Sequence, residues 1–373
     1  MGQELSRREA LRLLAAGAVG AACGAMLGAG PSEAAAAAHE ASFYDQLGGS
    51  KIRCRLCPKE CVVGDRERGF CGVRENRGGR YYTLVHGQCA ALNVDPIEKK
   101  PLFHFLPGST ALSMATAGCN MDCKNCQNWE ISQSRPEQIR DVMALQPSQF
   151  PGMAKRQGAR SIAYTYSEPV VFYEYMLDIA RAARAAGIRS VMISNGYIRA
   201  EPMTRLAGAL DAIKIDLKAM SDQFYKTYCV GTVGPVLDTI RLIKRLGKWL
   251  EIVYLVVPTL NDSETAIRQL CTWIKANVGT EVPLHFSRFH PQYQMKSLPP
   301  TPYETLERCR RIARATGLSF VYLGNVPGEA PVTTWCPRCG KAVVRRNGFQ
   351  VLEVSLRNGA CKYCSRAIPG VWA

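Results

Sequence analysis

The sequence predicts an α/β protein, with a partial barrel of six or seven β/α units at its centre and a cysteine-rich module on either side. Two observations lead to this fold class. Short β-rich runs alternate with amphipathic helical stretches between residues 105 and 328, and most of the 16 cysteines of the 373-residue chain fall into three tight groups. Such alternation is typical of parallel strands joined by right-handed crossovers. Cysteines separated by a few residues are typical of metal ligation.

The first 38 residues predict an export signal. Arg7 and Arg8 precede a Gly- and Ala-rich apolar stretch over 13–30 and a small-residue run over 34–38, and paired arginines favour the twin-arginine route. We expect cleavage near Ala38 and a periplasmic or membrane-tethered protein, with membrane contact only through this segment if it is uncleaved. The alternatives are an amphipathic N-terminal arm and a cytoplasmic location.

Residues 42–101 form the predicted N-terminal cysteine-rich module. Its clustered cysteines are Cys54, Cys57, Cys61 and Cys71. Four thiolates would saturate either a zinc ion or a four-iron cluster. The spacing therefore leaves a second, auxiliary [4Fe–4S] cluster and a zinc site open, with redox-active thiols as a third alternative.

The central region, 105–328, carries the predicted barrel. Strands are expected at 111–116, 161–166, 190–194, 212–217, 250–257, 284–289 and 320–324. Helices are expected at 171–186, 204–209, 235–246, 263–277 and 302–316. Six or seven such units are too few for a complete eightfold barrel. In these folds the chemistry lies at the carboxyl ends of the strands.

The loop after the first of these strands contains Cys119, Cys123 and Cys126. Three thiolates at these spacings can hold three corners of a cubane iron–sulfur cluster, and no fourth cysteine is nearby in the sequence. One iron would then keep an open coordination position, as catalytic metal centres do. The alternative is a three-cysteine zinc site completed by a remote ligand.

Residues 333–373 form the predicted C-terminal module. Two Cys-x2-Cys pairs, Cys336 with Cys339 and Cys361 with Cys364, predict a zinc ribbon in which four thiolates close a tetrahedral site. Rubredoxin-like iron and an auxiliary cluster are the alternatives. The remaining cysteines are expected to be ordinary packing thiols: Cys23, Cys89, Cys229, Cys271 and Cys309.

The Cys-x3-Cys-x2-Cys loop, placed after the first strand of a β/α series, resembles the radical S-adenosylmethionine (SAM) superfamily. The resemblance implies a TIM-like partial barrel and a [4Fe–4S] cluster whose open iron binds SAM. It also implies an oxidoreductase-like enzyme that needs a reducing electron donor. SAM is cleaved to a 5′-deoxyadenosyl radical, which abstracts hydrogen from a substrate that the resemblance leaves open.

Segments at the strand ends resemble activating enzymes of glycyl-radical enzymes. The resemblance implies these SAM-binding residues: Ser167, Glu168, Asn195, Asp216, Lys218 and His290. Each type has a structural alternative, namely a helix cap for Glu168, a strand-end salt bridge for Asp216 and Lys218, and a packed histidine for His290.

Two positions depart from the family pattern. Asn125 stands where an aromatic residue is usual, so we expect Trp129 or Val326 to cover the adenine ring. Ile193 replaces an acidic residue that the activating enzymes carry, which argues against a bound monovalent cation there.

Over nearly all of residues 51–372 the chain is similar to one branch, the radical SAM component of the AmmeMemoRadiSam system. The segments that carry this resemblance are 95–105, 126–133, 164–169, 289–291, 324–328 and 368–372. The resemblance implies the products of the associated AmmeMemoRadiSam families as partners, and it implies no particular substrate.

The net charge of +16 raises the question of nucleic-acid binding. Aromatic residues make up only 8% of the chain and no base-stacking motif accompanies the charge, so we do not expect nucleic acid as a partner. Much of the positive charge lies in the two outer modules, where it would surround anionic metal–thiolate centres. The predicted function is radical SAM chemistry. The alternatives are activation of a protein glycine and a non-catalytic exported metal-binding protein.

Overall fold

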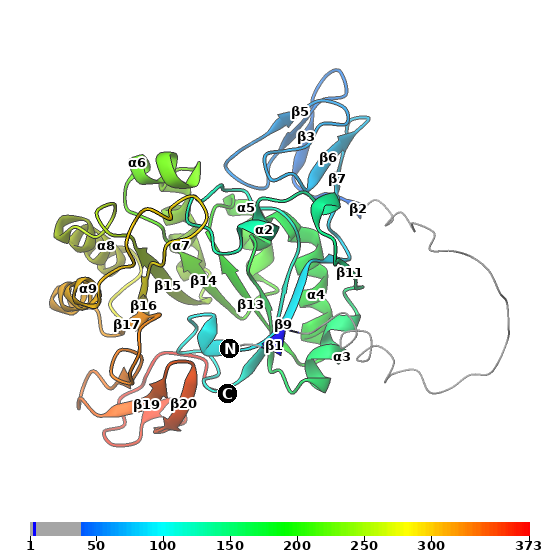
Figure 1. Cartoon of the computed structure of the whole chain (residues 1–373). Coiled ribbons are helices and arrows are strands. Elements are labelled where there is room, and N and C mark those ends of the chain that lie inside the picture. Colours follow the sequence, from blue (N-terminus) through cyan, green and yellow to red (C-terminus); the bar gives the residue numbers. More distant parts are fainter. Residues whose placement is uncertain (1–2, 5–38) are drawn as a thin grey trace, which may run out of the picture.

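The fold is organised around one nine-stranded sheet (Figure 1). The computed structural model of the chain describes residues 3–4 and 39–373, and the predicted export signal lies outside them except for residues 3–4. The sheet order is β1 (Gln3–Glu4), β9 (Ala91–Pro96), β10 (Thr110–Ala115), β12 (Ser161–Tyr164), β13 (Arg189–Ser194), β14 (Ala212–Asp216), β15 (Trp249–Val256), β16 (Leu284–Arg288) and β17 (Val321–Gly324).

The strands from β10 to β17 are parallel and pair in the order of the sequence. This confirms the predicted partial β/α barrel, and the seven strands match the expected ranges to within two residues. β9 pairs antiparallel with β10 although it lies inside the range predicted as the N-terminal module. The barrel sheet therefore begins earlier in the chain than the helix–strand alternation indicated, because a strand that pairs antiparallel with its neighbour needs no crossover helix.

Helices connect the parallel strands and bury their apolar faces on the sheet. They are α3 (Gln149–Arg156), α4 (Tyr173–Ala185), α5 (Ala200–Ala207), α7 (Gly234–Arg245), α8 (Glu264–Asn277) and α9 (Tyr303–Thr316). Their ends follow local chemistry: the Ser263 side chain caps α8 by accepting from Ala266 N–H, and Gly317 ends α9 with φ of +103°. None of the helices in the described residues is both long and apolar enough to cross a membrane.

Short helical turns join these elements. They are η1 (Ile97–Lys99), α2 (Trp129–Ser132), η2 (Pro136–Gln138), η3 (Pro169–Phe172), α6 (Asp222–Phe224) and the π-helical η4 (Tyr225–Cys229). η3 and α4 together occupy the range predicted as one helix, and Pro169 stands at the first position of η3, where proline is favoured.

The N-terminal module consists of small antiparallel sheets at one end of the barrel (Figure 1). One contains β3 (Tyr44–Gln46), β4 (Ile52–Cys54) and β5 (Val62–Val63), and another contains β2 (His39–Glu40), β7 (Arg80–Thr83) and β6 (Arg74–Arg77). β8 (Gln88–Cys89) pairs with β11 (Met143–Ala144).

The C-terminal module lies at the opposite end of the barrel in Figure 1. It contains β18 (Thr334–Trp335), β19 (Ala342–Asn347) and β20 (Gln350–Val354) in one sheet, and β21 (Leu356–Arg357) with β22 (Ala360–Cys361) in another. Its apolar core includes Phe103, Phe320 and Tyr322 from the barrel region, so the module and the barrel share one core.

A buried polar network closes this end of the barrel. Glu251 on β15 accepts hydrogen bonds from the backbone N–H groups of Phe103 (3.0 Å) and His104 (2.8 Å), and its carboxylate lies 2.7 Å from His285 Nε2. His104 Nδ1 in turn lies 2.7 Å from the Pro369 carbonyl oxygen. Segments 95–105 and 368–372, quoted above only for their resemblance, therefore meet in space and seal the barrel floor.

Candidate active site

The carboxyl ends of the parallel strands surround one cavity of about 480 Å³. All the residues predicted for the central cluster and for SAM line it: Cys119, Cys123, Cys126, Ser167, Glu168, Asn195, Asp216, Lys218 and His290. They come from the ends of β10, β12, β13, β14 and β16 and from the loops that follow. The structure thus brings the whole set to the face where β/α folds carry out chemistry. The role of each residue stays a prediction.

The cysteine loop begins at Gly118, which has φ of +93°. An added Cβ there would lie 2.6 Å from Val73 Cγ1 and 2.8 Å from the carbonyl oxygen of Cys71. Glycine is therefore needed both for the backbone conformation and for the close approach of the N-terminal module. The loop that carries Cys119, Cys123 and Cys126 therefore packs directly against the N-terminal module at Cys71 and Val73.

Cys229 lies behind the same loop, although the sequence placed it among ordinary packing thiols. It is fully buried, and its carbonyl oxygen accepts a hydrogen bond of 3.1 Å from Asp122 N–H. A hydrogen bond to Cys229 raises the pKa of the Cys123 thiol. Sequence spacing could not reveal this contact because Cys229 is far along the chain from the loop.

The sulfur atoms of the three loop cysteines lie farther apart than the ligand atoms of a single metal ion do. Among the described residues, the groups whose potential ligand atoms all lie within 4.8 Å of one another are the four C-terminal cysteines and the trio His39, His86 and Asp178. The loop cysteines are in neither group. Their arrangement around the cavity fits the separated corners of a cubane cluster better than one zinc ion.

Glu168 links the ends of β12 and β13. Its Oε2 accepts a hydrogen bond from Asn195 N–H (2.8 Å), and its Oε1 accepts from Ser194 Oγ (2.6 Å) and Val170 N–H (3.1 Å). The last contact caps η3, so the helix-cap alternative holds together with the position in the cavity wall. Burial raises the pKa of Glu168 to about 7, although the three donors favour the charged form.

Asp216 lies between two lysines at the end of β14. Lys214 Nζ donates to Asp216 Oδ1, and Lys218 Nζ is 3.7 Å from Oδ2. Burial alone would raise the pKa of Asp216, but the two ammonium groups hold it below its usual value. The predicted strand-end salt bridge is therefore present, and it lies in the cavity wall. Lys214 also lines the cavity and was not predicted as a site residue.

A second group of charged residues in the wall was also missed. Lys100 Nζ is 2.5 Å from Asp95 Oδ2 and 4.2 Å from the ring centre of Tyr166, and Lys99 Nζ is 2.9 Å from Asp95 Oδ1. Burial lowers the pKa of Lys100 to about 8, against the opposing effect of Asp95. All three charged residues lie in segment 95–105, which carries part of the resemblance to the AmmeMemoRadiSam branch, and this was the one feature of the sequence that pointed to them.

Ser167 shows that the cavity fits a polar ligand. Its Oγ is buried and has no hydrogen-bond partner in the protein. A buried hydroxyl without a partner costs free energy that a ligand atom would offset. The part of Ser167 in binding SAM stays a prediction.

The apolar part of the wall differs from the expectation for adenine. Trp129 stacks on Tyr293 with ring centres 5.1 Å apart, and Val326 is buried outside the cavity wall. The apolar residues that do line the cavity are Ile193, Val253, Leu255, Phe289 and Phe349.

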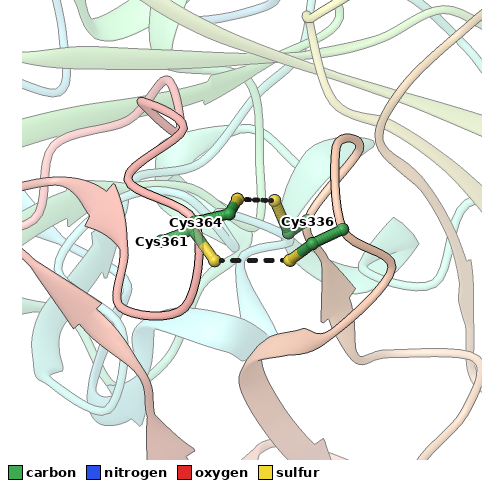
Figure 2. Close-up of side chains that lie close together, drawn as sticks. Cys336, Cys361 and Cys364 are labelled. Atoms are coloured by element: carbon green, nitrogen blue, oxygen red, sulfur yellow. Dashed lines mark hydrogen bonds between the residues drawn. The ribbon is translucent and has the colours of Figure 1, made fainter.

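The four C-terminal cysteines form a compact group whose sulfur atoms all lie within 4.8 Å of one another (Figure 2). Cys336 Sγ is 3.6 Å from Cys364 Sγ, and Cys339 Sγ is 3.7 Å from Cys361 Sγ. A tetrahedral ion with metal–sulfur bonds of about 2.3 Å separates its ligands by about 3.8 Å. This spacing fits a zinc-ribbon-like module with one metal ion and leaves no room for a cubane.

The four N-terminal cysteines surround a small void that also includes Arg74, Tyr81 and Asn120 in its wall: Cys54, Cys57, Cys61 and Cys71. Burial raises the pKa of the Cys57 thiol to about 12 and that of the Cys71 thiol to about 11. Thiols of this kind are poor nucleophiles without a bound metal, which argues against redox-active thiols.

The trio of His39, His86 and Asp178 is a further group that the sequence did not reveal. The two imidazole rings stack with centres 3.9 Å apart and an interplanar angle of 3°, and His86 Nε2 is 3.1 Å from Asp178 Oδ2. A metal ion lies near the plane of each imidazole that binds it, and two stacked parallel planes share no such point. The trio is therefore a stacked pair of histidines, one of which is hydrogen-bonded to Asp178, and it is not a metal site.

An α/β partial barrel with a three-thiol loop after its first parallel strand, and acidic and amide groups at the following strand ends, defines a class of iron–sulfur enzymes that act on SAM. The family model described as the radical SAM superfamily matches residues 114–271. A Methanocaldococcus jannaschii protein named only as uncharacterized is 44% identical over 88% of this chain and 98% of its own length. This chain belongs to the radical SAM superfamily and is an enzyme.

Two further proteins are similar to this chain, one in sequence and one in structure. The pyruvate formate-lyase 1-activating enzyme of Escherichia coli is 23% identical over 55% of this chain and 89% of that enzyme. A crystal structure of a radical SAM methyltransferase from Sphaerobacter thermophilus aligns with 60% of this chain and 68% of that chain, at 16% identity and a TM-score of 0.46.

Proposed function

We propose that this enzyme cleaves SAM reductively to a 5′-deoxyadenosyl radical, at a [4Fe–4S] cluster bound by Cys119, Cys123 and Cys126, and that the radical abstracts hydrogen from a substrate. The observation that carries the proposal is the single cavity lined by the three thiols and all the predicted SAM contacts. The cluster supplies the electron when bound and SAM supplies the radical.

The residues of the chain bind and orient SAM in this proposal. Ser167 and Glu168 would bind its amino group, because one offers a free buried hydroxyl oxygen and the other a carboxylate. Asp216 and Lys218 would enclose its carboxylate side, and Asn195 would face the ribose. Exposed His290 lies at the cavity wall and would also approach SAM.

A second candidate is activation of a partner protein by hydrogen abstraction from a glycine. The similarity to pyruvate formate-lyase 1-activating enzyme favours it. The products of the associated AmmeMemoRadiSam families are the partners we would test first, by looking for a glycyl radical in each after anaerobic incubation with reduced enzyme and SAM.

The metal at the C-terminal cysteines is a further part of the proposal. We infer that Cys336, Cys339, Cys361 and Cys364 bind one zinc ion, because their sulfur spacing fits it. Rubredoxin-like iron would have the same geometry, so metal analysis decides between zinc and iron.

Export by the twin-arginine route stays part of the proposal, since that route carries proteins already folded around their cofactors.

The experiment is anaerobic reconstitution of the full chain with iron and sulfide, reduction with dithionite and assay of 5′-deoxyadenosine formed from SAM. Wild-type protein should form it, and Cys126→Ala should not. The matched control is Cys271→Ala, which removes a buried thiol on α8 away from the cavity. Absence of product from wild-type protein that holds its cluster and binds SAM would refute the proposal.

A further inference from the structure

The N-terminal and C-terminal groups of four cysteines differ in their sulfur spacing within the same molecule. The C-terminal sulfurs pair at 3.6 and 3.7 Å, the distance that a tetrahedral ion imposes. The N-terminal sulfurs do not form a group of three within 4.8 Å, although all are described residues. Instead they line one void together. A four-iron cube needs this wider arrangement, because each thiolate binds at an outer corner.

Arg74 provides a second, independent sign of a ligand in this void. Its side chain is 1% exposed and lines the void, and Nη2 donates to Glu174 Oε1 (2.7 Å) and to the Ser42 carbonyl oxygen (3.0 Å). Its Nε and Nη1 atoms have no hydrogen-bond partner. Buried, unpartnered guanidinium donors are costly, and an anionic metal–thiolate centre beside them would offset that cost.

The surroundings of the thiols also suit a cluster. Phe70 N–H donates to Cys61 Sγ at 3.3 Å, a contact of the type that tunes iron–sulfur centres. Lys59 Nζ lies 3.9 Å from the ring centre of Phe70, so a second cation lies at the edge of the void. Positive charge beside the thiols favours an anionic occupant but does not separate a cluster from zinc, since both carry net negative charge with four thiolates. The sulfur spacing makes that distinction.

The void adjoins the catalytic loop. Asn120, directly after Cys119, lines the void, and its Oδ1 accepts a hydrogen bond of 2.8 Å from Asn195 Nδ2. Asn195 in turn donates its backbone N–H to Glu168 in the SAM cavity. The Asn120 side chain therefore lies between the void lined by the N-terminal thiols and the wall of the SAM cavity.

We propose that Cys54, Cys57, Cys61 and Cys71 bind a second [4Fe–4S] cluster, fully ligated by protein, against the back of the SAM-binding loop. This inference rests on the proposed function for the identity of its neighbour, the cluster at Cys119, Cys123 and Cys126. It does not rest on that function for its own occupancy. With four protein ligands the second cluster has no open iron, so it would serve as an electron carrier and not as a second SAM site.

The test is metal analysis and electron paramagnetic resonance of the full chain after anaerobic reconstitution. Wild type should hold about eight iron atoms and about one zinc per chain. The variant Cys119→Ala/Cys123→Ala/Cys126→Ala should keep about four iron atoms and show a [4Fe–4S]⁺ signal after dithionite. The variant Cys57→Ala/Cys61→Ala should also keep about four, and the control Cys271→Ala/Cys309→Ala should keep about eight.

Three results would overturn the inference, two of them in the variant that lacks Cys119, Cys123 and Cys126. In the variant without the catalytic cysteines, about two zinc ions and no iron would identify a zinc site instead. Only about one zinc ion and no iron in that variant would mean that the N-terminal thiols bind no metal. The variant leaves the N-terminal module unaltered, so misfolding of Cys57→Ala/Cys61→Ala does not affect this readout. Four irons in wild type with 5′-deoxyadenosine formation would reject this inference alone. An iron-loaded N-terminal site without product from wild type would reject the proposed function alone.

Discussion

The backbone N–H of Asn195 donates a hydrogen bond of 2.8 Å to Glu168 Oε2 across two neighbouring parallel strands. The contact joins two residues that the sequence assigned to SAM from separate motifs. It also uses up part of the hydrogen-bonding capacity of Glu168, whose other oxygen accepts from Ser194 and Val170. Glu168 is thus held in one orientation before any ligand arrives.

This orientation predicts a pH dependence of SAM binding. Burial raises the pKa of Glu168 to about 7, so the free enzyme loses the carboxylate as the pH falls through that value. Because the ionised form would bind the amino group of SAM, we expect affinity to weaken roughly tenfold for each pH unit below 7. Calorimetric titration of oxidised, cluster-loaded enzyme between pH 5.5 and 8.5 measures it.

The variant Glu168→Gln isolates this effect, since SAM itself also titrates. The ratio of wild-type to variant affinity should rise with pH up to about 7 and then level off. Glu201→Gln, at an exposed position of α5, is the matched control and should follow wild type. A ratio that does not change with pH would remove Glu168 from SAM binding.

The close approach of the chain at Gly118 predicts that the N-terminal module stabilises the loop of Cys119, Cys123 and Cys126. In Gly118→Ala the new Cβ would meet Val73 and Cys71 at 2.6 and 2.8 Å, in addition to the strain of a positive φ. The control Gly187→Ala has φ of +74° and no atom within 4 Å of the added Cβ, so it carries the strain alone, of order 1 kcal/mol. We expect Gly118→Ala to lose several times more stability than Gly187→Ala and to bind less iron, measured by urea unfolding and iron analysis. Equal losses in both variants would mean that the loop does not depend on this contact.

The sequence predicted the barrel strands well because they are short buried runs that alternate with amphipathic helices. The same rule placed Glu168, Asn195 and Asp216 at strand ends, and a parallel sheet brings such ends together without further information. Contacts between distant segments could not be predicted in this way. Cys229 beside Cys123, and Lys214 beside Asp216 in the cavity wall, depend on the tertiary packing of single turns.

The outer modules were predictable in composition and not in geometry. Cysteine spacing gave the same ligand number for both groups of four. Only the three-dimensional structure separates the close C-terminal sulfurs, such as those of Cys336 and Cys364, from the N-terminal sulfurs that line a void together with Arg74. β9 was missed for a related reason, since a strand that pairs antiparallel with β10 needs no crossover helix between the two strands.

The C-terminal metal group predicts a separable loss of zinc. In Cys361→Ser we expect loss of about one zinc ion per chain with iron unchanged, because this group is distinct from both other cysteine groups. The melting temperature should fall, since the module shares its core with Phe320 and Tyr322 of the barrel. Metal analysis and thermal unfolding check this, with Cys309→Ser as the control for loss of a buried thiol. Loss of about one iron in place of zinc would instead identify a rubredoxin-like site.

The buried network around Glu251 is expected to contribute to the free energy of unfolding. Its carboxylate is fully buried and accepts hydrogen bonds from Phe103 and His104 N–H and from Trp249 Nε1, with His285 at 2.7 Å. In Glu251→Gln an amide N–H₂ group must face donors, so we expect a loss of about 2–4 kcal/mol in the free energy of unfolding. Urea unfolding measures it, with Glu264→Gln at an exposed position of α8 as the control within about 0.5 kcal/mol of wild type. A loss below about 0.5 kcal/mol would show that the seal between segments 95–105 and 368–372 does not depend on this carboxylate.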